Sequence, residues 1–260
     1  MTDASDDLAL ALELADLADS ITLGRYRAEN LRVETKPDRT PVTEADRAVE
    51  QAIRQQLAAA RPEDAVIGEE YGAGAERASR SRDRRWIVDP IDGTMSYMRG
   101  MPTWSTLIAL SVEGETAVGV VSAPALPRRW WAARGLGAFA DGVPIAVSSI
   151  SRLDDAMLTW SGIEDWDGIG RLEAIVELGR RCWRSRGIGD AWQYMLVAEG
   201  AAEIALDPEV SVWDLAAPMV IVEEAGGRFT DLGGVRTPAG GDGIATNGLV
   251  HEAALAIVGR

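Results

Sequence analysis

The chain has 260 residues, 47% of them hydrophobic, and can bury a full core as one compact unit. Its formal net charge of -15 at pH 7 argues against nucleic acid or an anionic membrane as a partner, because proteins that bind those polyanions carry an excess of Lys and Arg. No charged-then-apolar leader and no apolar run of about 20 residues occur, so we expect a cytoplasmic protein without a membrane span.

Helices dominate the first part of the predicted structure. Apolar residues recur at helical spacing over residues 6–28, and residues 43–60 form a second amphipathic pattern. Residues 72–85 are rich in Gly, Ser and Arg and predict a mobile loop, whose arginines either face solvent or cover a substrate. Residues 86–88 then predict a buried strand, which Pro90 and Gly93 end.

Strands and helices alternate in the rest of the chain. Residues 104–148 predict antiparallel hairpins, and the loose dinucleotide fingerprint at residues 135–140 belongs to one of them, because Asp141-Gly142 and Pro144 follow in place of a helix. We expect helices at 171–182, 191–199, 214–225 and 250–258, and strands near 203–207, 228–231 and 243–246. The prediction is a single unit with an α+β half (1–148) and an α/β half (149–260).

Three residue types occur only once. Cys182 is the only cysteine, which excludes an internal disulfide and a cysteine-based zinc site. His251 is the only histidine and is expected to be exposed on the last helix, so acid–base chemistry falls to carboxylates and hydroxyls. Lys36 is the only lysine, which excludes a Walker A loop; it either belongs to a site or is a solvated loop residue.

Carboxylates gather on three separated segments. These are Glu69-Glu70, Asp89-Pro90-Ile91-Asp92-Gly93-Thr94 and Trp213-Asp214-Leu215-Ala216-Ala217. Carboxylate and carbonyl oxygens suit Mg²⁺ or Mn²⁺ and suit softer metals poorly. If the fold brings the three segments together, they can hold one or more hard divalent ions.

The middle segment explains how such a site could act on a phosphate. Asp89 and Asp92 follow the predicted strand 86–88, and open α/β sheets bind ligands at the carboxyl ends of strands. Gly93 lets the backbone approach a phosphate closely, Thr94 offers a hydroxyl to orient an attacking water, and a helix that begins near Asp92 adds N–H donors. The alternative is an ordinary turn at Asp92-Gly93 with an exposed Asp89 beside it.

The three segments together resemble the signature set of the inositol monophosphatase family. The resemblance extends through Lys36 with Val42-Thr43-Glu44-Ala45-Asp46, the hairpin at 137–142 and Glu224-Ala225-Gly226-Gly227, and so covers nearly the whole chain. It implies a layered α/β/α/β/α sandwich, with the metal site between its halves. It also implies Mg²⁺-dependent, lithium-sensitive hydrolysis of a small phosphate monoester, usually by a homodimer.

The resemblance further implies roles for individual residues. Glu69, Asp89 and the carbonyl of Ile91 would hold one Mg²⁺. Asp89, Asp92 and Asp214 would hold a second, and a third, weaker ion would lie near Glu69 and Asp46, with Mn²⁺ as a possible substitute. Thr94, assisted by Glu69, would orient the attacking water, while the amides around Gly93 and Thr94 stabilise the phosphoryl oxygens. The resemblance also implies that Asp92, together with Glu69 and Thr94, is a catalytic residue.

Within the family, the chain is most similar to the branch that hydrolyses histidinol phosphate in histidine biosynthesis. The similarity lies in residues 184–194 and 205–214, where acids and aromatic residues suit an ammonium group and an imidazole. The residues implied to bind substrate are Ile91, Asp92, Gly93, Thr94, Arg186, Asp190, Asp207 and Asp214. The alternatives are a phosphatase for inositol 1-phosphate or a broad range of small monoesters, and a non-catalytic member that binds a partner.

Several of these residues also have plausible structural roles. Asp190 with Gln193 matches a helix N-cap and capping box, and Asp207-Pro208 matches a turn. Arg186 could pair with a surface carboxylate instead of contacting phosphate, and Asp214 could be an N-cap. At least one of the aromatic residues of helix 191–199 is expected in the core.

Overall fold

The computed structural model describes residues 4–37, 40–73 and 81–259 of the chain. Its helices are α1 (Ala4–Arg25), α2 (Glu44–Ala60), α3 (Thr94–Met98), α4 (Ile163–Gly168), α5 (Leu172–Arg181), α6 (Asp190–Ala198), α7 (Val212–Glu224) and α8 (His251–Val258), with a short 3-10 helix η2 (Leu153–Asp155). Its strands are β1 (Val33–Thr35), β2 (Pro41–Thr43), β3 (Asp64–Gly68), β4 (Gly72–Ala73), β5 (Ser81–Asp92), β6 (Ser105–Val112), β7 (Glu115–Ala123), β8 (Arg128–Ala133), β9 (Gly137–Ala140), β10 (Val143–Pro144), β11 (Met157–Trp160), β12 (Arg184–Gly187), β13 (Ile204–Asp207), β14 (Arg228–Thr230) and β15 (Gly243–Thr246).

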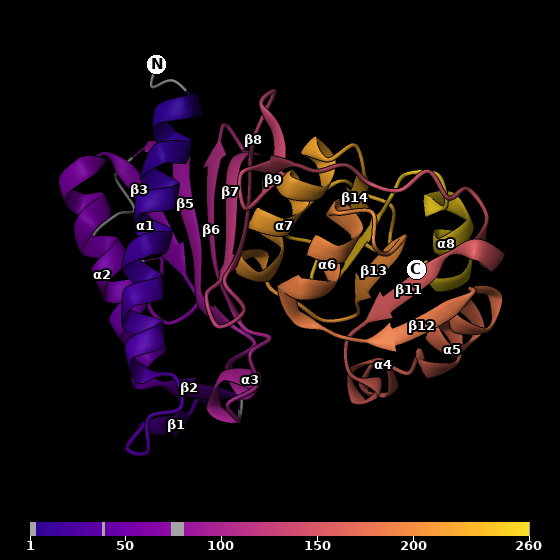
Figure 1. The fold of residues 1–260 in the computed structure, drawn as a ribbon, viewed down its shortest axis with the longest axis horizontal. Coiled ribbons are helices and arrows are strands. Elements are labelled where there is room, and N and C mark those ends of the chain that lie inside the picture. Colours follow the sequence, from indigo (N-terminus) through magenta and orange to yellow (C-terminus); the bar gives the residue numbers. More distant parts are fainter. Residues whose placement is uncertain (1–3, 38–39, 74–80, 260) are drawn as a thin grey trace.

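An eight-stranded sheet forms the first half of the molecule. Its strand order is β10-β9-β8-β7-β6-β5-β3-β4, and β3 and β5 are the parallel pair within it. Helices α1 and α2 cover one face, where Leu14 and Ile53 pack with Trp86 of the sheet (Figure 1). The apolar stripes predicted for residues 6–28 and 43–60 are therefore confirmed as the helices that bury this face.

A five-stranded sheet forms the second half. Its strand order is β12-β11-β13-β15-β14, with β11 parallel to both of its neighbours. Helices α6 and α7 lie between the two sheets, while α4, α5 and α8 lie on the far side of the second sheet (Figure 1). The layers run α/β/α/β/α, which confirms the predicted architecture.

One hydrophobic core joins the two sheets through the middle helices. It contains Ile87 and Leu107 from the first sheet, Tyr194 and Leu215 from α6 and α7, and Ala245 from the second sheet. Because this core draws on both sheets, the relative position of the two halves is fixed by packing. The division at residue 148 stays a prediction.

The strand that leads to the acidic turn is longer than the sequence indicated. β5 begins at Ser81 and ends at Asp92, so residues 81–85 belong to a strand and not to the predicted loop 72–85; residues 74–80 of that loop lie outside the described residues. Its pairing with β6 shifts register between Asp89 and Asp92, where Pro90 has no N–H to donate. Asp89 and Asp92 pair with β6 on either side of this bulge.

The prediction of an exposed His251 is wrong. The ring is fully buried, and the hydroxyls of Thr230 and Thr246 lie 3.1 Å from Nε2 and 3.0 Å from Nδ1. Burial, and then the charge of Arg228, lower its pKa to about 4. Two polar partners from β14 and β15 thus make the histidine part of the core.

None of the helices in the described ranges is long and apolar enough to cross a bilayer.

The close contact between α7 and β7 gives a test of the packing. A Cβ added to Gly119 would lie 2.5 Å from Cγ1 of Val220 and 2.7 Å from the carbonyl oxygen of Ala217. We expect Gly119→Ala to lower the free energy of unfolding by about 2 kcal/mol, because overpacking forces the helix off the sheet. Gly24→Ala is the matched control, since nothing lies within 4 Å of its Cβ position. Equal stability of the two variants in denaturant unfolding would contradict this packing.

Candidate active site

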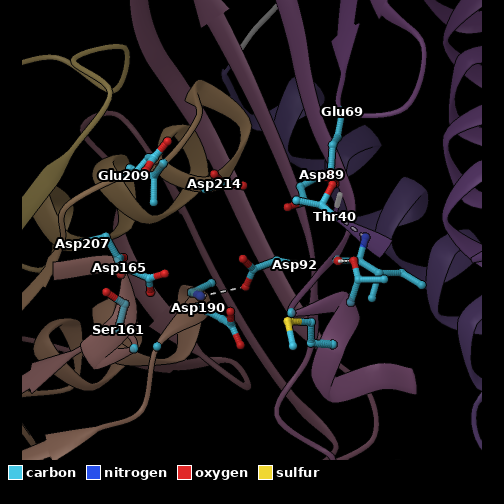
Figure 2. A pocket seen from close by; sticks show the side chains of 18 of the residues that line it. Thr40, Glu69, Asp89, Asp92, Ser161, Asp165, Asp190, Asp207, Glu209 and Asp214 are labelled. Carbon is cyan, nitrogen blue, oxygen red and sulfur yellow. Dashed lines mark hydrogen bonds between the residues drawn. The ribbon is translucent and has the colours of Figure 1, made fainter. Parts of the chain in front are cut away.

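A cavity of about 410 Å³ lies where the carboxyl end of β5 meets α6, α7 and the end of β13. In Figure 2, Glu69, Asp89 and Asp92 enter from one side, and Asp165, Asp190 and Asp207 enter from the other. Helices α6 and α7 both begin at this cavity, so their positive dipole ends face it. The cavity therefore lies at the place the sequence indicated, between the two halves of the molecule.

Three carboxylates converge at the centre of the cavity. Oxygen atoms of Asp89, Asp92 and Asp214 all lie within 4.8 Å of one another. Each carboxylate accepts one backbone N–H: Ile91 donates to Asp89 over 3.0 Å, Ala191 to Asp92 over 2.7 Å and Ser211 to Asp214 over 2.7 Å. These bonds fix one oxygen of each carboxylate.

The three carboxylates repel one another. Burial, and then the neighbouring carboxylates, raise the pKa of Asp89 and of Asp92 well above the usual range, and burial raises the pKa of Asp214 to about 6. Within the described part of the chain no Lys, Arg or His forms an ion pair with any of them. A hard divalent cation fits this set of oxygen donors, because it would neutralise charges that no side chain neutralises.

Glu69 reaches the cavity beside this cluster, and Lys36 bonds both Glu69 and its neighbour Glu70. Lys36 donates to Glu69 over 2.7 Å and to Glu70 over 2.6 Å, and only 16% of the lysine side chain is exposed. Burial alone would lower the pKa of Lys36, but these two hydrogen bonds raise it overall. Of the two roles considered for Lys36, the structure supports the one at the site.

Thr94 has a different carboxylate partner from the one expected. Its hydroxyl lies 2.9 Å from the carbonyl oxygen of Ile91 and 3.3 Å from Oδ1 of Asp46, and no bond to Glu69 is found among the described residues. Asp46 is fixed in turn by the capping box of α2, where Thr43 donates its N–H over 2.8 Å and its hydroxyl over 2.5 Å. Asp46 therefore joins the site through Thr94, and burial raises its pKa to about 6.

Gly93 and Asp190 fit together across the cavity. Gly93 has a φ of 79°, and a Cβ at this position would lie 2.8 Å from Oδ2 of Asp190. Only glycine satisfies both the backbone angle and the close approach. Asp190 itself has a φ of 52°, which is unusual for a residue with a side chain, and such strain often marks functional sites.

The predicted capping box at Asp190 is wrong. Gly189 is the N-cap of α6, Asp190 is the first helical residue, and the side-chain amide of Gln193 bonds Asp207 instead of turning back. Asp190 is therefore free to face the cavity, where burial, and then the charges of Asp207 and Asp214, raise its pKa to about 7.

Asp207 ends β13 and is not a turn residue. Tyr194 donates its hydroxyl to Oδ2 over 2.6 Å, and the amide of Gln193 donates to the same oxygen over 2.5 Å. The N-cap of α7 is Ser211 and not Asp214. Asp214 lies three residues after this N-cap, and its carboxylate accepts a hydrogen bond from the N–H of Ser211. Both acids line the cavity, as predicted.

Arg186 does not reach the cavity. It lies on the edge strand β12, is exposed, and its guanidinium donates to the carbonyl oxygen of Ser185. The geometry thus gives no support to the expected contact between Arg186 and phosphate.

Sequence reasoning missed several residues that line the cavity. They include Thr40, Met95, Ser161, Asp165 and Glu209. Asp165 lies on α4 and Ser161 just after β11, a strand that was not predicted. Glu209 is two residues beyond Asp207, so its short distance from a predicted site residue was the signal that could have found it.

Comparison with known proteins gives the same relatives by sequence and by structure. A family model described as "Inositol monophosphatase family" matches residues 3–259. A histidinol-phosphatase of Mycobacterium tuberculosis is 54% identical over 255 residues, which cover 96% of this chain and 96% of that protein. A histidinol-phosphatase of Streptomyces coelicolor is 49% identical over 261 residues, which cover 97% and 96%. The solved structure of an IMPase of Thermotoga maritima has a TM-score of 0.86 at 31% identity and covers 97% of this chain and 96% of its own.

The raised pKa values predict how stability depends on pH without metal. Between the unfolded value near 4 and the folded values of about 6 to 7, Asp46, Asp190, Asp207 and Asp214 hold protons in the folded state that the unfolded chain has lost. Stability of the metal-free protein therefore falls as the pH rises through this window. We expect the Tm in chelator to fall by about 5 °C or more from about pH 5 to about pH 8, and saturating Mg²⁺ to remove most of this fall.

Asp92→Asn is the variant that tests the cause of this dependence. Asparagine keeps an acceptor for the N–H of Ala191 but removes one of the three central charges. In chelator at about pH 8, we expect the variant to melt above the wild type, and to gain less from Mg²⁺. A variant that melts below the wild type in chelator would show that repulsion does not govern stability here.

Proposed function

The chain belongs to the inositol monophosphatase family, and from this membership we propose that it hydrolyses histidinol phosphate to histidinol and phosphate, with Mg²⁺ as its cofactor. The full-length similarity to the histidinol-phosphatases supports a phosphatase for a small phosphate monoester. The choice of substrate rests on the charge of the cavity.

Eight carboxylates line the cavity, and none of the described residues that line it is Lys, Arg or His. The acids are Glu69, Asp89, Asp92, Asp165, Asp190, Asp207, Glu209 and Asp214. A phosphate group can bind among these acids only if metal ions supply the positive charge. The same charge favours an alcohol that is itself a cation, and histidinol, with its ammonium and imidazole, has that charge while inositol has none.

The carboxylates divide into two groups by position. Glu69, Asp89, Asp92 and Asp214, with the carbonyl of Ile91, would hold the metal ions. The acids on the facing wall, which we call the acid wall, are Asp165, Asp190, Asp207 and Glu209. The metal group would thus bind the phosphate half of the substrate, and the acid wall its cationic half.

The residues around Thr94 can prepare the attack on phosphorus. When bound, Mg²⁺ would offset the phosphate charge and make a coordinated water more acidic. Thr94 Oγ1 can accept a hydrogen bond from the attacking water while it donates to Asp46, so a proton can pass along this pair to the Asp46 carboxylate. The first N–H groups of α3 and the N–H of Gly93 would donate to the phosphoryl oxygens.

Further properties follow from the same proposal. We expect Mn²⁺ to substitute for Mg²⁺, lithium to inhibit, and the protein to act as a cytoplasmic homodimer in histidine biosynthesis. Family membership and the set of hard oxygen donors support the metal. The dimer rests on the resemblance to the family.

Phosphate release from two substrates tests the proposal. With Mg²⁺, we expect kcat/KM for histidinol phosphate to exceed that for inositol 1-phosphate by about 100-fold or more, because each contact between a carboxylate and a cationic group is worth about 1.5–3 kcal/mol. Chelator should abolish both activities. Asp92→Asn, which keeps the fold, should lose most of the turnover.

Each other outcome contradicts a distinct part of the proposal. Preference for inositol 1-phosphate would overturn the substrate and leave the metal chemistry intact. Release that chelator does not reduce would overturn the role of the metal. No release from either substrate, in a preparation that binds Mg²⁺, would favour the non-catalytic alternative.

A further inference from the structure

One carboxylate of the acid wall is held much more firmly than the others. Asp207 is buried at the end of β13, and Tyr194 and Gln193 both donate to its Oδ2, over 2.6 Å and 2.5 Å. Both donors lie on α6, and each is almost fully buried. Two donors on one oxygen fix the plane of the carboxylate at the wall of the cavity that Asp207 lines.

The hydrogen bonding of Gln193 shows that its side-chain amide is oriented to donate to Asp207. Its NH₂ group donates to Asp207 and approaches the carbonyl oxygen of Leu206 at 3.5 Å, while its Oε1 is buried without a hydrogen-bond partner among the described residues. A buried acceptor without a partner is costly and uncommon. Turning the amide over would place Oε1 against the carboxylate, so the observed orientation is the one that serves Asp207.

The ring of Tyr194 is fixed independently of its hydroxyl. It packs against Phe229 with ring centroids 5.6 Å apart and is part of the core that joins the two sheets. The packing of the ring therefore fixes the position of the hydroxyl relative to Asp207. This arrangement is expected for a residue that orients a binding group.

We propose that Tyr194 and Gln193 are positioning residues, which fix Asp207 as an ionised acceptor for a cationic nitrogen on the alcohol half of the substrate. Donors to a carboxylate favour its charged form, and a fixed acceptor loses little freedom when the cation binds. The inference rests on the proposed function for the chemistry of the substrate, and adds to it the residues that set the preference for cationic esters.

Tyr194→Phe tests this role, since it removes only the hydroxyl and keeps the ring. The measurement is the ratio of kcat/KM for histidinol phosphate to that for glycerol 2-phosphate, an ester of an uncharged alcohol, at saturating Mg²⁺. We expect this ratio to fall about tenfold, through KM for the cationic ester, because one hydrogen bond to a charged group is lost. Gln193→Leu should move the ratio in the same direction.

The matched control is Tyr26→Phe. The hydroxyl of Tyr26 also donates to a single acceptor, the carbonyl oxygen of Gly100, and its ring also packs in an aromatic cluster, but the residue does not line the cavity. The substrate ratio of Tyr26→Phe should stay within about twofold of the wild type, since this variant removes a hydroxyl hydrogen bond that does not involve Asp207. An equal fall of both substrates in Tyr194→Phe, or no fall, would overturn the inference.

Two further measurements separate this inference from the proposed function. The first is the affinity for histidinol alone, measured by calorimetry in the presence of a chelator. We expect this affinity to fall about tenfold in Tyr194→Phe and to stay unchanged in Tyr26→Phe. If the wild type does not hydrolyse histidinol phosphate, the proposed function fails, and the ratio is measured with phosphoethanolamine as the cationic ester. A fall in that ratio would still support the positioning role, and an unchanged ratio would overturn it.

Discussion

Repulsion between buried carboxylates is the constraint on which the site depends. Asp89, Asp92 and Asp214 bring oxygens within 4.8 Å of one another, in a place where burial weakens solvation. The fold compensates in part through backbone N–H groups from three separate segments, of which that of Ala191 crosses from the second half of the chain to Asp92 in the first. A divalent cation would offset the remaining negative charge. The layered architecture holds the three segments in the positions that such a cation needs.

The two middle helices explain how distant segments meet. α6 and α7 pack in one core with both sheets, and both begin at the cavity. One layer of the sandwich therefore supplies Asp190, Asp214 and the N–H of Ala191, while the bulge at the end of β5 supplies Asp89 and Asp92. A metal group on one side and an acid wall on the other are a direct consequence of this layering.

The sequence allowed prediction of those parts of the fold and the site that depend on local pattern. The helical stripes, the hairpins and the motif that carries Asp89 and Asp92 were all visible, because each depends on residues close together in the chain. The resemblance to a family then supplied the layered architecture and the convergence with Asp214, which no spacing along the chain could show.

The features that could not be predicted from the sequence depend on tertiary contacts. Gln193 seemed placed to cap a helix at Asp190, yet its amide bonds Asp207 on another element. His251 seemed exposed, yet two threonines from neighbouring strands enclose it. Asp165 reaches the cavity only because α4 follows β11, whose parallel pairing with β13 brings that segment beside Asp207. In each case the deciding contact joins residues that local periodicity does not connect.

The most direct test is anomalous diffraction from crystals of the protein grown with Mn²⁺ in place of Mg²⁺. We expect Mn²⁺ at the centre of the cavity, coordinated by oxygens of Asp89, Asp92 and Asp214, with further density toward Glu69. Ordered Mn²⁺ only on exposed acids, with the three central carboxylates free of metal at saturating concentration, would contradict the view that a divalent cation balances the charge of this site.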